Sequence, residues 1–352
     1  MRPFAIPAMA NVHSHAFQRD LRGLGERSGR PDDDFWSWRE GMYALAERLD
    51  PAGMRDVAER VYREMVAAGY GAVGEFHYVH HGPDGTPYED ANAMAVAVAE
   101  AGAACGLRVV LLPAAYHRGG HARFRDPTVE AFLARVDDLR ARGFTVGVAA
   151  HSVRAVPADW LREIAAYASA HDLVLHIHAH EQPRELAECE AEHGCSPIEL
   201  LDRCGFLGPR TTIVHAIHVS EHDIALLADA GAIVATCPTT EGNLGDGHFP
   251  ALAYRDAGVR LAIGSDSNVI VDPFEEAREL ETGARRERRT RHALLAAAGD
   301  LWGSLVRDGC ASLGIEEGAT VTIDLDHPRL RGVAVEDIMR AVATCAAAEV
   351  VA

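Results

Sequence analysis

The chain has 352 residues, of which 48% are hydrophobic and 24% charged, and its formal net charge is −18. These values fit a globular protein with a large core, and the negative charge argues against a nucleic-acid partner, because phosphate binding needs clustered lysine and arginine. No apolar run reaches the roughly 20 residues of a membrane helix, and the N-terminus lacks a signal-peptide pattern. We therefore expect a cytoplasmic protein without a membrane partner.

Two residue types narrow the chemistry further. The chain contains no lysine, so all 34 cationic side chains are arginine. This excludes Schiff-base catalysis, a P-loop lysine and a carboxylated lysine that bridges two metals. The seven cysteines are scattered without zinc-ribbon spacing, and we interpret them as reduced thiols.

Short apolar runs alternate with longer amphipathic segments along most of the chain. Unalternating runs indicate buried parallel strands, and eight of them separated by helices fit an α/β fold, a (β/α)8 barrel of the TIM type. The absence of GxGxxG and P-loop motifs disfavours an open doubly wound sheet. Helical patterns include 158–172 and 220–231, with Ser220 as N-cap and Gly231 as stop. The predicted strands are 7–12, 70–76, 107–113, 145–150, 173–178, 211–215, 232–236 and 261–265.

Two segments stand outside this repeat. Residues 13–69 are long for one strand-to-helix connection, and the stretch PDDDFWSWRE at 31–40 predicts a loop over the barrel mouth. The stretch ATVTIDLDHP at 319–328 predicts a strand and a turn beyond the eight units.

Polar side chains gather where the predicted strands end, the face on which barrel enzymes carry their catalytic groups. His13 and His15 are two residues apart, so both point to the same side of the first strand. A third histidine follows the fifth strand, and Asp266 follows the eighth. Imidazole and carboxylate suit a divalent metal. We predict one metal held by His13, His15, His178 and Asp266.

The fifth strand leaves its ligand open, because His176, His178 and His180 alternate toward one face. We favour His178, which lies nearest to the strand end, with His180 as the second choice. His176 is expected to lie deeper in the core. Histidines without a partner pattern are interpreted as surface or loop residues, among them His77, His80 and His81.

Five strings occur in order at plausible spacing: ANVHSHAFQR, GEFHYVHH, AHSVRAVP, HIHAHEQ and GSDSN. They resemble the N-formimino-L-glutamate deiminase family of the amidohydrolase superfamily, over roughly residues 7–330. The resemblance implies hydrolysis of N-formimino-L-glutamate to N-formyl-L-glutamate and ammonia, in histidine degradation. It also implies one metal, usually Zn2+, although Fe2+ or Mn2+ would fit, and attack of metal-bound hydroxide on the formimino carbon. The absence of lysine agrees with a mononuclear site.

The resemblance also assigns roles to individual residues. Asp266 would bind the metal and take a proton from its water, and Glu181 would carry a proton to the imine nitrogen. His215 would orient the hydroxide or stabilise the intermediate; alternatively, it is a fifth ligand. The substrate is a small dicarboxylate, which arginine can bind in a planar, bidentate manner. The positions matching its binding residues are Gln18, Arg39, Tyr78, His151 and Arg154.

Members of this family usually carry a stretch before the first strand that joins C-terminal residues in a small β-sandwich. This chain begins almost at its first predicted strand, which leaves open whether it is truncated. We expect a catalytic barrel over 1–310 and, over 311–352, a reduced or incomplete β-sandwich. The resemblance also implies a homodimer.

Two other functions remain open. One is a deaminase of the same superfamily that acts on a purine, pterin or triazine ring, which would leave Arg39 and Arg154 without a role. The other is a non-catalytic barrel that acts as a binding scaffold, which the full set of candidate ligands disfavours.

Overall fold

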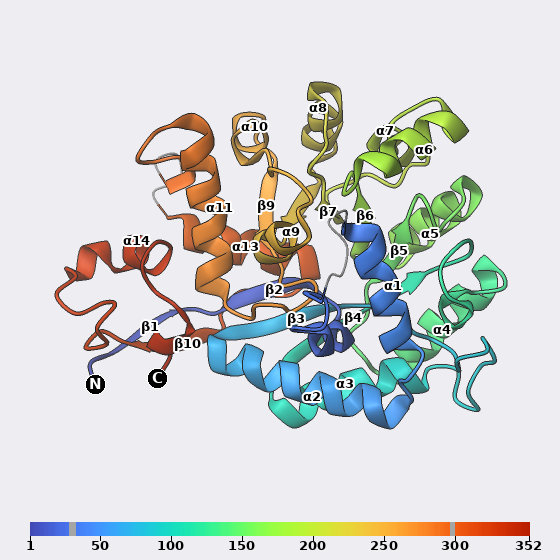
Figure 1. Ribbon diagram of the computed structural model, residues 1–352, viewed down its shortest axis with the longest axis horizontal. Coiled ribbons are helices and arrows are strands. Elements are labelled where there is room, and N and C mark those ends of the chain that lie inside the picture. Colours follow the sequence, from blue (N-terminus) through green and yellow to red (C-terminus); the bar gives the residue numbers. More distant parts are fainter. Residues whose placement is uncertain (28–32, 296–299) are drawn as a thin grey trace.

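The computed structural model describes residues 1–27, 33–295 and 300–352. Eight parallel strands run in the order β2-β3-β4-β5-β6-β7-β8-β9, and helices surround them on the outside (Figure 1). The predicted (β/α)8 barrel is confirmed. All residues of β2, β6, β7 and β8 are buried, which explains their unalternating apolar sequences. The strands are β2 (Met9–Ser14), β3 (Tyr70–His77), β4 (Arg108–Ala115), β5 (Val148–Ser152), β6 (Leu175–Ala179), β7 (Thr211–His215), β8 (Ile233–Thr236) and β9 (Arg260–Ile263).

Hydrogen bonds between β2 and the residues after β9 complete the ring. The side chain of Asn11 donates to Ser265 Oγ at 2.7 Å and accepts from the Ser265 backbone N at 3.0 Å. The backbone N of Asp266 donates to the His13 carbonyl at 3.0 Å, and the His15 N donates to the Asp266 carbonyl at 2.9 Å. This closure brings the first and last predicted metal ligands together, although they are about 250 residues apart in the chain.

The helices follow the predicted pattern. The side chain of Ser220 accepts from the Asp223 N in a capping box, and Gly231 ends the helix with a left-handed φ of 65°, as expected from the sequence. Within the described parts of the chain, no helix has the length and apolar content needed to cross a bilayer. The helices after β3 are α3 (Ala93–Cys105), α4 (Val129–Ala141), α5 (Ala158–Ala170), α6 (Pro183–His193), α7 (Pro197–Arg203), α8 (Glu221–Ala230), α9 (Pro238–Leu244), α10 (Ala251–Asp256), α11 (Pro273–Arg288) and α13 (Leu301–Leu313).

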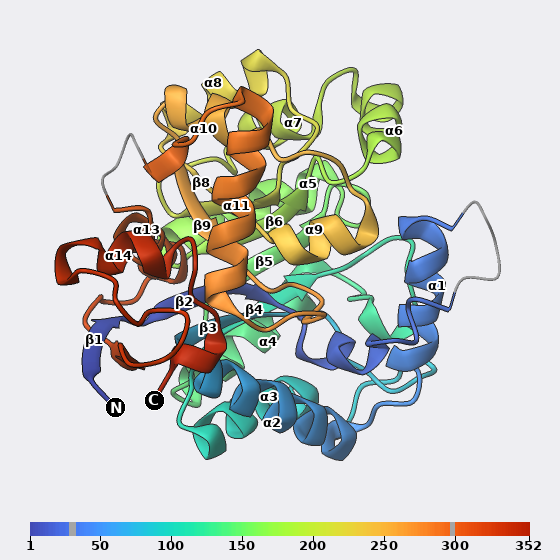
Figure 2. The same ribbon diagram turned by 60° about the vertical axis from the view of Figure 1, so that its left-hand side comes forward.

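The segment between β2 and β3 is mostly helical, whereas the sequence predicted a loop for part of it. It contains a 3-10 turn (Ala16–Leu21), α1 (Phe35–Ala46) and α2 (Pro51–Ala68). Asp34 starts α1 because its side chain accepts hydrogen bonds from the backbone N of Trp36 and Ser37. Pro31 and Asp32 of the predicted loop lie outside the described residues. Figure 2 shows α1 on the opposite side of the molecule from the two chain ends.

A second, two-stranded sheet lies beside the chain ends (Figure 2). In it, β1 (Pro3–Pro7) pairs in antiparallel orientation with β10 (Thr320–Asp324), so the strand expected in 319–328 is confirmed. The predicted first strand, 7–12, corresponds to β2, and β1 is a further strand that the sequence did not predict. The division at residue 310 stays a prediction: α13 runs across it, and β1 pairs with a strand beyond it. The C-terminal part also contains α14 (Ile338–Val342).

Candidate active site

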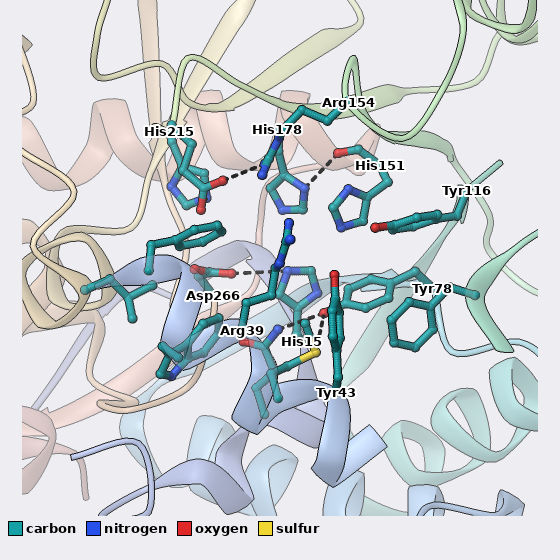
Figure 3. A pocket seen from close by; sticks show the side chains of 17 residues that line it. His15, Arg39, Tyr43, Tyr78, Tyr116, His151, Arg154, His178, His215 and Asp266 are labelled. Carbon is teal, nitrogen blue, oxygen red and sulfur yellow. Dashed lines mark hydrogen bonds and ion pairs between the residues drawn. The ribbon is translucent and has the colours of Figure 1, made fainter. Parts of the chain in front are cut away.

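Imidazole and carboxylate groups meet at the C-terminal ends of β2, β6 and β7 and just after β9. One ligand atom from each of His13, His178, His215 and Asp266 lies within 4.8 Å of the others. The Nε2 atoms of His13 and His178 are 3.0 Å apart. His15 lies outside this compact group of four, but its Nε2 is 3.2 Å from Asp266 Oδ1, the same distance as that of His13 (Figure 3). We call these five residues the donor cluster.

The donor cluster has the chemistry that a divalent metal requires. Burial lowers the pKa of His13 to about 3 and the pKa of His178 well below its ordinary value, so both imidazoles are neutral. Burial opposes ionisation of Asp266, but its close contacts with the imidazoles of His13 and His15 hold its pKa well below the ordinary value. Two neutral Nε2 atoms that face each other at 3.0 Å beside a carboxylate are poor partners for one another and good ligands for a cation.

Backbone carbonyls orient two of the donor histidines through their other ring nitrogen. His15 Nδ1 donates to the Phe76 carbonyl at 2.8 Å, and His178 Nδ1 donates to the His151 carbonyl at 2.8 Å. Each bond places the ring proton on Nδ1 and leaves the Nε2 lone pair directed into the donor cluster. These two ligand atoms are thus positioned by the backbone of neighbouring strands.

A buried carboxylate orients His215 in the same way. Glu241, at the start of α9, accepts from His215 Nδ1 at 3.2 Å, from the Cys237 N at 2.8 Å and from Thr236 Oγ1 at 2.7 Å. Burial lowers the pKa of His215, but Glu181 and Glu241 outweigh it and raise the value to about 10. His215, Cys237 and Glu241 form a second compact group of ligand types. Because both oxygens of Glu241 already accept hydrogen bonds, we assign this group to orientation of His215.

Sequence reasoning missed Glu241. The only signal was a carboxylate shortly after the seventh barrel strand, in the string TCPTTE, with no spacing that links it to His215.

The structure separates the three histidines that the sequence left as alternatives on the fifth barrel strand. His178 points into the donor cluster. His176 Nε2 donates to the Ser312 carbonyl at 2.9 Å, deeper in the barrel. His180 lies just past β6 with a φ of 57°; its Nδ1 donates to the His218 carbonyl at 2.8 Å, and its other nitrogen accepts a backbone N–H. Of the three, only His178 belongs to the compact group of ligand atoms.

Of the three histidines interpreted as surface or loop residues, His80 and His81 lie in the loop after β3 and His77 is the last residue of that strand, and none of them is at the surface. All three are buried, because the segment after β3 folds inward against the arginine of a buried ion pair. That arginine, Arg135, donates to His80 Nδ1 at 3.1 Å and pairs with Asp126 at 2.5 Å. Nothing in the local sequence links Arg135 to this segment.

A pocket opens above the donor cluster (Figure 3). It brings together every sequence-predicted site residue except His13, which lies beneath it. Gln18 Nε2 donates to the Tyr78 hydroxyl at 2.9 Å. The pocket also contains an aromatic wall that the sequence did not predict, since its members are scattered over α1 and the loops after β3 and β4. The lining residues are His15, Gln18, Phe35, Trp38, Arg39, Met42, Tyr43, Tyr78, Tyr116, Phe124, His151, Arg154, His178, Glu181, His215, Leu244 and Asp266.

Two arginines reach this pocket from different elements. Arg154 follows β5 and pairs with Glu181, with Nη2 3.0 Å from Glu181 Oε2. Arg39 lies on α1, with its guanidinium 4.5 Å from the ring centre of Trp36 and 5.5 Å from that of Tyr43. Within the described residues, no carboxylate pairs with Arg39, and its buried Nε has no hydrogen-bond partner. The Arg39 guanidinium can therefore bind an anion in the pocket.

The pocket contains a neutral imidazole beside these cations. Burial lowers the pKa of His151 well below its ordinary value, and Arg154 lowers it further. His151 therefore offers hydrogen bonds without adding a charge.

A barrel of this kind with a His/Asp donor cluster at its mouth defines the class of metal-dependent barrel hydrolases. The model of the Amidohydrolase family matches residues 4–308. The chain belongs to this family.

Several characterised relatives and solved structures are similar to the chain. A formimidoylglutamate deiminase from Pseudomonas aeruginosa is 41% identical over 82% of this chain, and the aligned region spans 66% of that enzyme, just under two thirds. A 5-methylthioadenosine/S-adenosylhomocysteine deaminase from Haloarcula marismortui is 30% identical, over 92% of this chain and 74% of its own length. The crystal structure of an amidohydrolase from Brucella melitensis superposes with a TM-score of 0.89 at 35% identity, covering 99% of this chain and 84% of that one.

Proposed function

We propose that the chain hydrolyses N-formimino-L-glutamate to N-formyl-L-glutamate and ammonia with the help of one divalent metal, most simply Zn2+. The observation that carries this proposal is the pair Arg39 and Arg154 in the pocket that adjoins the donor cluster. Two guanidinium groups beside a hydrolytic centre suit a substrate with two carboxylates. The similarity to a formimidoylglutamate deiminase supports the same substrate.

The metal would be held by His13, His15, His178 and Asp266. His215 lies beside three of them and would bind as a fifth ligand only after losing the proton that the neighbouring carboxylates stabilise. A divalent metal bound there supplies Lewis-acid activation of a water molecule as the nucleophile.

The proton transfers are assigned from position. Asp266 Oδ1 lies within the donor cluster and would accept the proton that the nucleophilic water loses. Glu181 projects into the pocket from the end of β6, with Oε1 3.7 Å from His215 Nε2. Glu181 would deliver a proton to the formimino nitrogen, which then leaves as ammonia. His215 would hold the nucleophile or the tetrahedral carbon in place.

The substrate would be held by the groups on the other side of the pocket. Arg154 and Arg39 would each pair with a carboxylate of the glutamate portion. Gln18, Tyr78 and the neutral His151 would donate or accept hydrogen bonds. Because the pocket places these groups above the donor cluster, a bound dicarboxylate would present its formimino end to the metal.

A second candidate is deamination of a ring such as adenine, which the aromatic wall and the adenosine-type relatives favour. The test is ammonia release after metal quantification, with Zn2+ supplied. Formiminoglutamate is compared with guanine, adenosine, cytosine and S-adenosylhomocysteine. Turnover of formiminoglutamate alone supports the proposal, whereas turnover of a ring and none of formiminoglutamate overturns it. A protein that binds no metal and releases no ammonia would be a binding scaffold.

A further inference from the structure

The proposed function requires a contact of Arg154 that competes with the one it makes in the structure. Arg154 is needed to bind a substrate carboxylate, yet its Nη2 donates to Glu181 Oε2 at 3.0 Å. Glu181 is the group that must approach the formimino nitrogen. A carboxylate held by a charge-assisted hydrogen bond to arginine cannot turn toward another group, because the ion pair fixes its orientation. Catalysis therefore requires Arg154 to release Glu181.

A second carboxylate lies on the other edge of the same guanidinium. Glu185, in the first turn of α6, is completely buried. Its Oε2 accepts from the Glu181 backbone N at 3.1 Å, but its Oε1 has no hydrogen-bond partner within the described residues. Arg154 Nε is equally without a partner, and the two atoms are 3.9 Å apart.

A guanidinium nitrogen and a carboxyl oxygen, each without a hydrogen-bond partner within the described residues, therefore face each other in a buried place. A shift of Arg154 by about 1 Å would bring Nε and Oε1 to the usual distance of roughly 2.8 Å and satisfy both atoms. Space for that shift exists, because a cavity lined by Arg154, Glu185, Arg118 and Val153 lies beside the guanidinium. The hydrogen bond to Glu181 would lengthen as the guanidinium moved.

We propose that Glu185 is the alternative partner of Arg154: when a substrate carboxylate binds Arg154, the guanidinium moves from Glu181 to Glu185, and Glu181 becomes available to the formimino group. Glu185 is then a positioning residue that acts through Arg154. This inference rests on the proposed function. It makes the substrate carboxylate that binds Arg154 a requirement for turnover as well as for binding. With an amidine that lacks this carboxylate, Arg154 would stay hydrogen-bonded to Glu181, and the amidine would react slowly.

The first experiment compares the effect on kcat of removing the charge of Glu185 with the effect of removing another glutamate charge on α6. Glu185→Gln keeps an oxygen for the Glu181 N but removes the charge that attracts Arg154. We expect kcat for formiminoglutamate to fall about 10-fold, the usual effect of one charge-assisted hydrogen bond, with a smaller change in KM. Glu190→Gln is the matched control: it lies on the same helix at an exposed position and should leave kcat unchanged.

A double variant shows whether Glu185 acts through Arg154. In an Arg154→Met background, Glu185→Gln should cause no further loss, because the guanidinium that it positions is gone. An equal loss in both backgrounds would overturn the proposal, because Glu185 would then act through the Glu181 backbone or through the fold.

The second experiment supplies the two parts of the substrate as separate molecules, to the unaltered holoenzyme and to Arg154→Met. N-propylformamidine has the formimino group and lacks both carboxylates, and glutarate supplies the dicarboxylate separately. Glutarate should accelerate ammonia release from N-propylformamidine about 10-fold or more, and Arg154→Met should abolish this acceleration. No acceleration at glutarate concentrations that inhibit formiminoglutamate turnover would overturn the inference. Such a result leaves the proposed function intact, because that function fails only if formiminoglutamate itself is not hydrolysed.

Discussion

The two sides of the pocket are built in different ways. The donor cluster comes from the ends of barrel strands, its histidines are almost fully buried, and fixed hydrogen bonds hold His15, His178 and His215 through their second ring nitrogen. The opposite side depends on Arg39 and Arg154, which come from a helix and a loop. Aromatic faces and the ion pairs of Arg154 hold these arginines, and within the described residues neither Nε has a hydrogen-bond partner.

This difference separates chemistry from recognition. A metal needs ligand atoms placed to within a fraction of an ångström, which a closed sheet provides because its strands are locked to both neighbours. A flexible dicarboxylate needs cations that can move to meet it, and stacked guanidinium groups retain that freedom. Substitutions in the donor cluster should therefore reduce the chemical step, whereas substitutions on the arginine side should alter substrate binding first.

The largest effect is expected at Asp266. Asp266→Asn removes both the anionic ligand and the proposed proton acceptor, so kcat should fall by about 1,000-fold or more. Metal content, measured by elemental analysis of the purified protein, should fall as well. Asp256→Asn, at an exposed position on α10, is the control and should leave both unchanged. A fully active, metal-loaded Asp266→Asn protein would show that the cluster is not the reactive centre.

Arg154→Met tests the arginine side. Loss of a bidentate partner for one carboxylate should reduce kcat/KM for formiminoglutamate about 100-fold, mainly through KM, and the metal content should stay at its original level. Arg203→Met, which removes an exposed arginine from α7, is the control. Unchanged steady-state kinetics would exclude Arg154 from the site, and a loss of metal would show that the two sides are coupled.

Glu241→Gln tests whether the fixed geometry of the donor cluster extends beyond its ligands. The substitution weakens the hold on His215 Nδ1 without touching the pocket, so activity or metal affinity should fall by about 10- to 100-fold. Chelator competition measures the affinity, and the ammonia assay measures kcat. Glu221→Gln, at the exposed start of α8, should change neither. If Glu241→Gln behaves as the control does, His215 is held by its strand alone.

The same difference explains how much could be predicted from the sequence. The barrel follows from local patterns, since each buried strand has its own apolar run and its own polar end. His13, His15 and Asp266 could be grouped because strand ends of a barrel share one face. The partners of these residues could not be predicted. Asn11 with Ser265, and His215 with Glu241, meet only after distant segments fold, and no period or spacing in the chain connects them.

The arginine side of the pocket was harder to predict from the sequence, for a related reason. Without the family resemblance, Arg39 is one of many arginines in an acidic chain. Its place in the pocket depends on where α1 crosses the barrel mouth, and that helix was expected to be part of a loop. Glu185 also looks like an ordinary first-turn carboxylate of α6, and only the buried contact geometry distinguishes it.

The smallest expected effect is at Trp36, and it tests the comparison most finely. The Trp36 ring centre lies 4.5 Å from the guanidinium carbons of both Arg39 and Arg184, and 5.6 Å from that of Arg154. A half-exposed cation–π contact contributes about 0.5–1 kcal/mol, so Trp36→Leu should raise KM about 3-fold. The value of kcat should stay constant, because the ring does not line the pocket or touch the donor cluster. Trp36→Phe keeps an aromatic face and should recover part of the loss. A fall in kcat with constant KM would instead mean that α1 helps to position the reacting groups, and the division between a fixed chemical side and an adaptable recognition side would not hold.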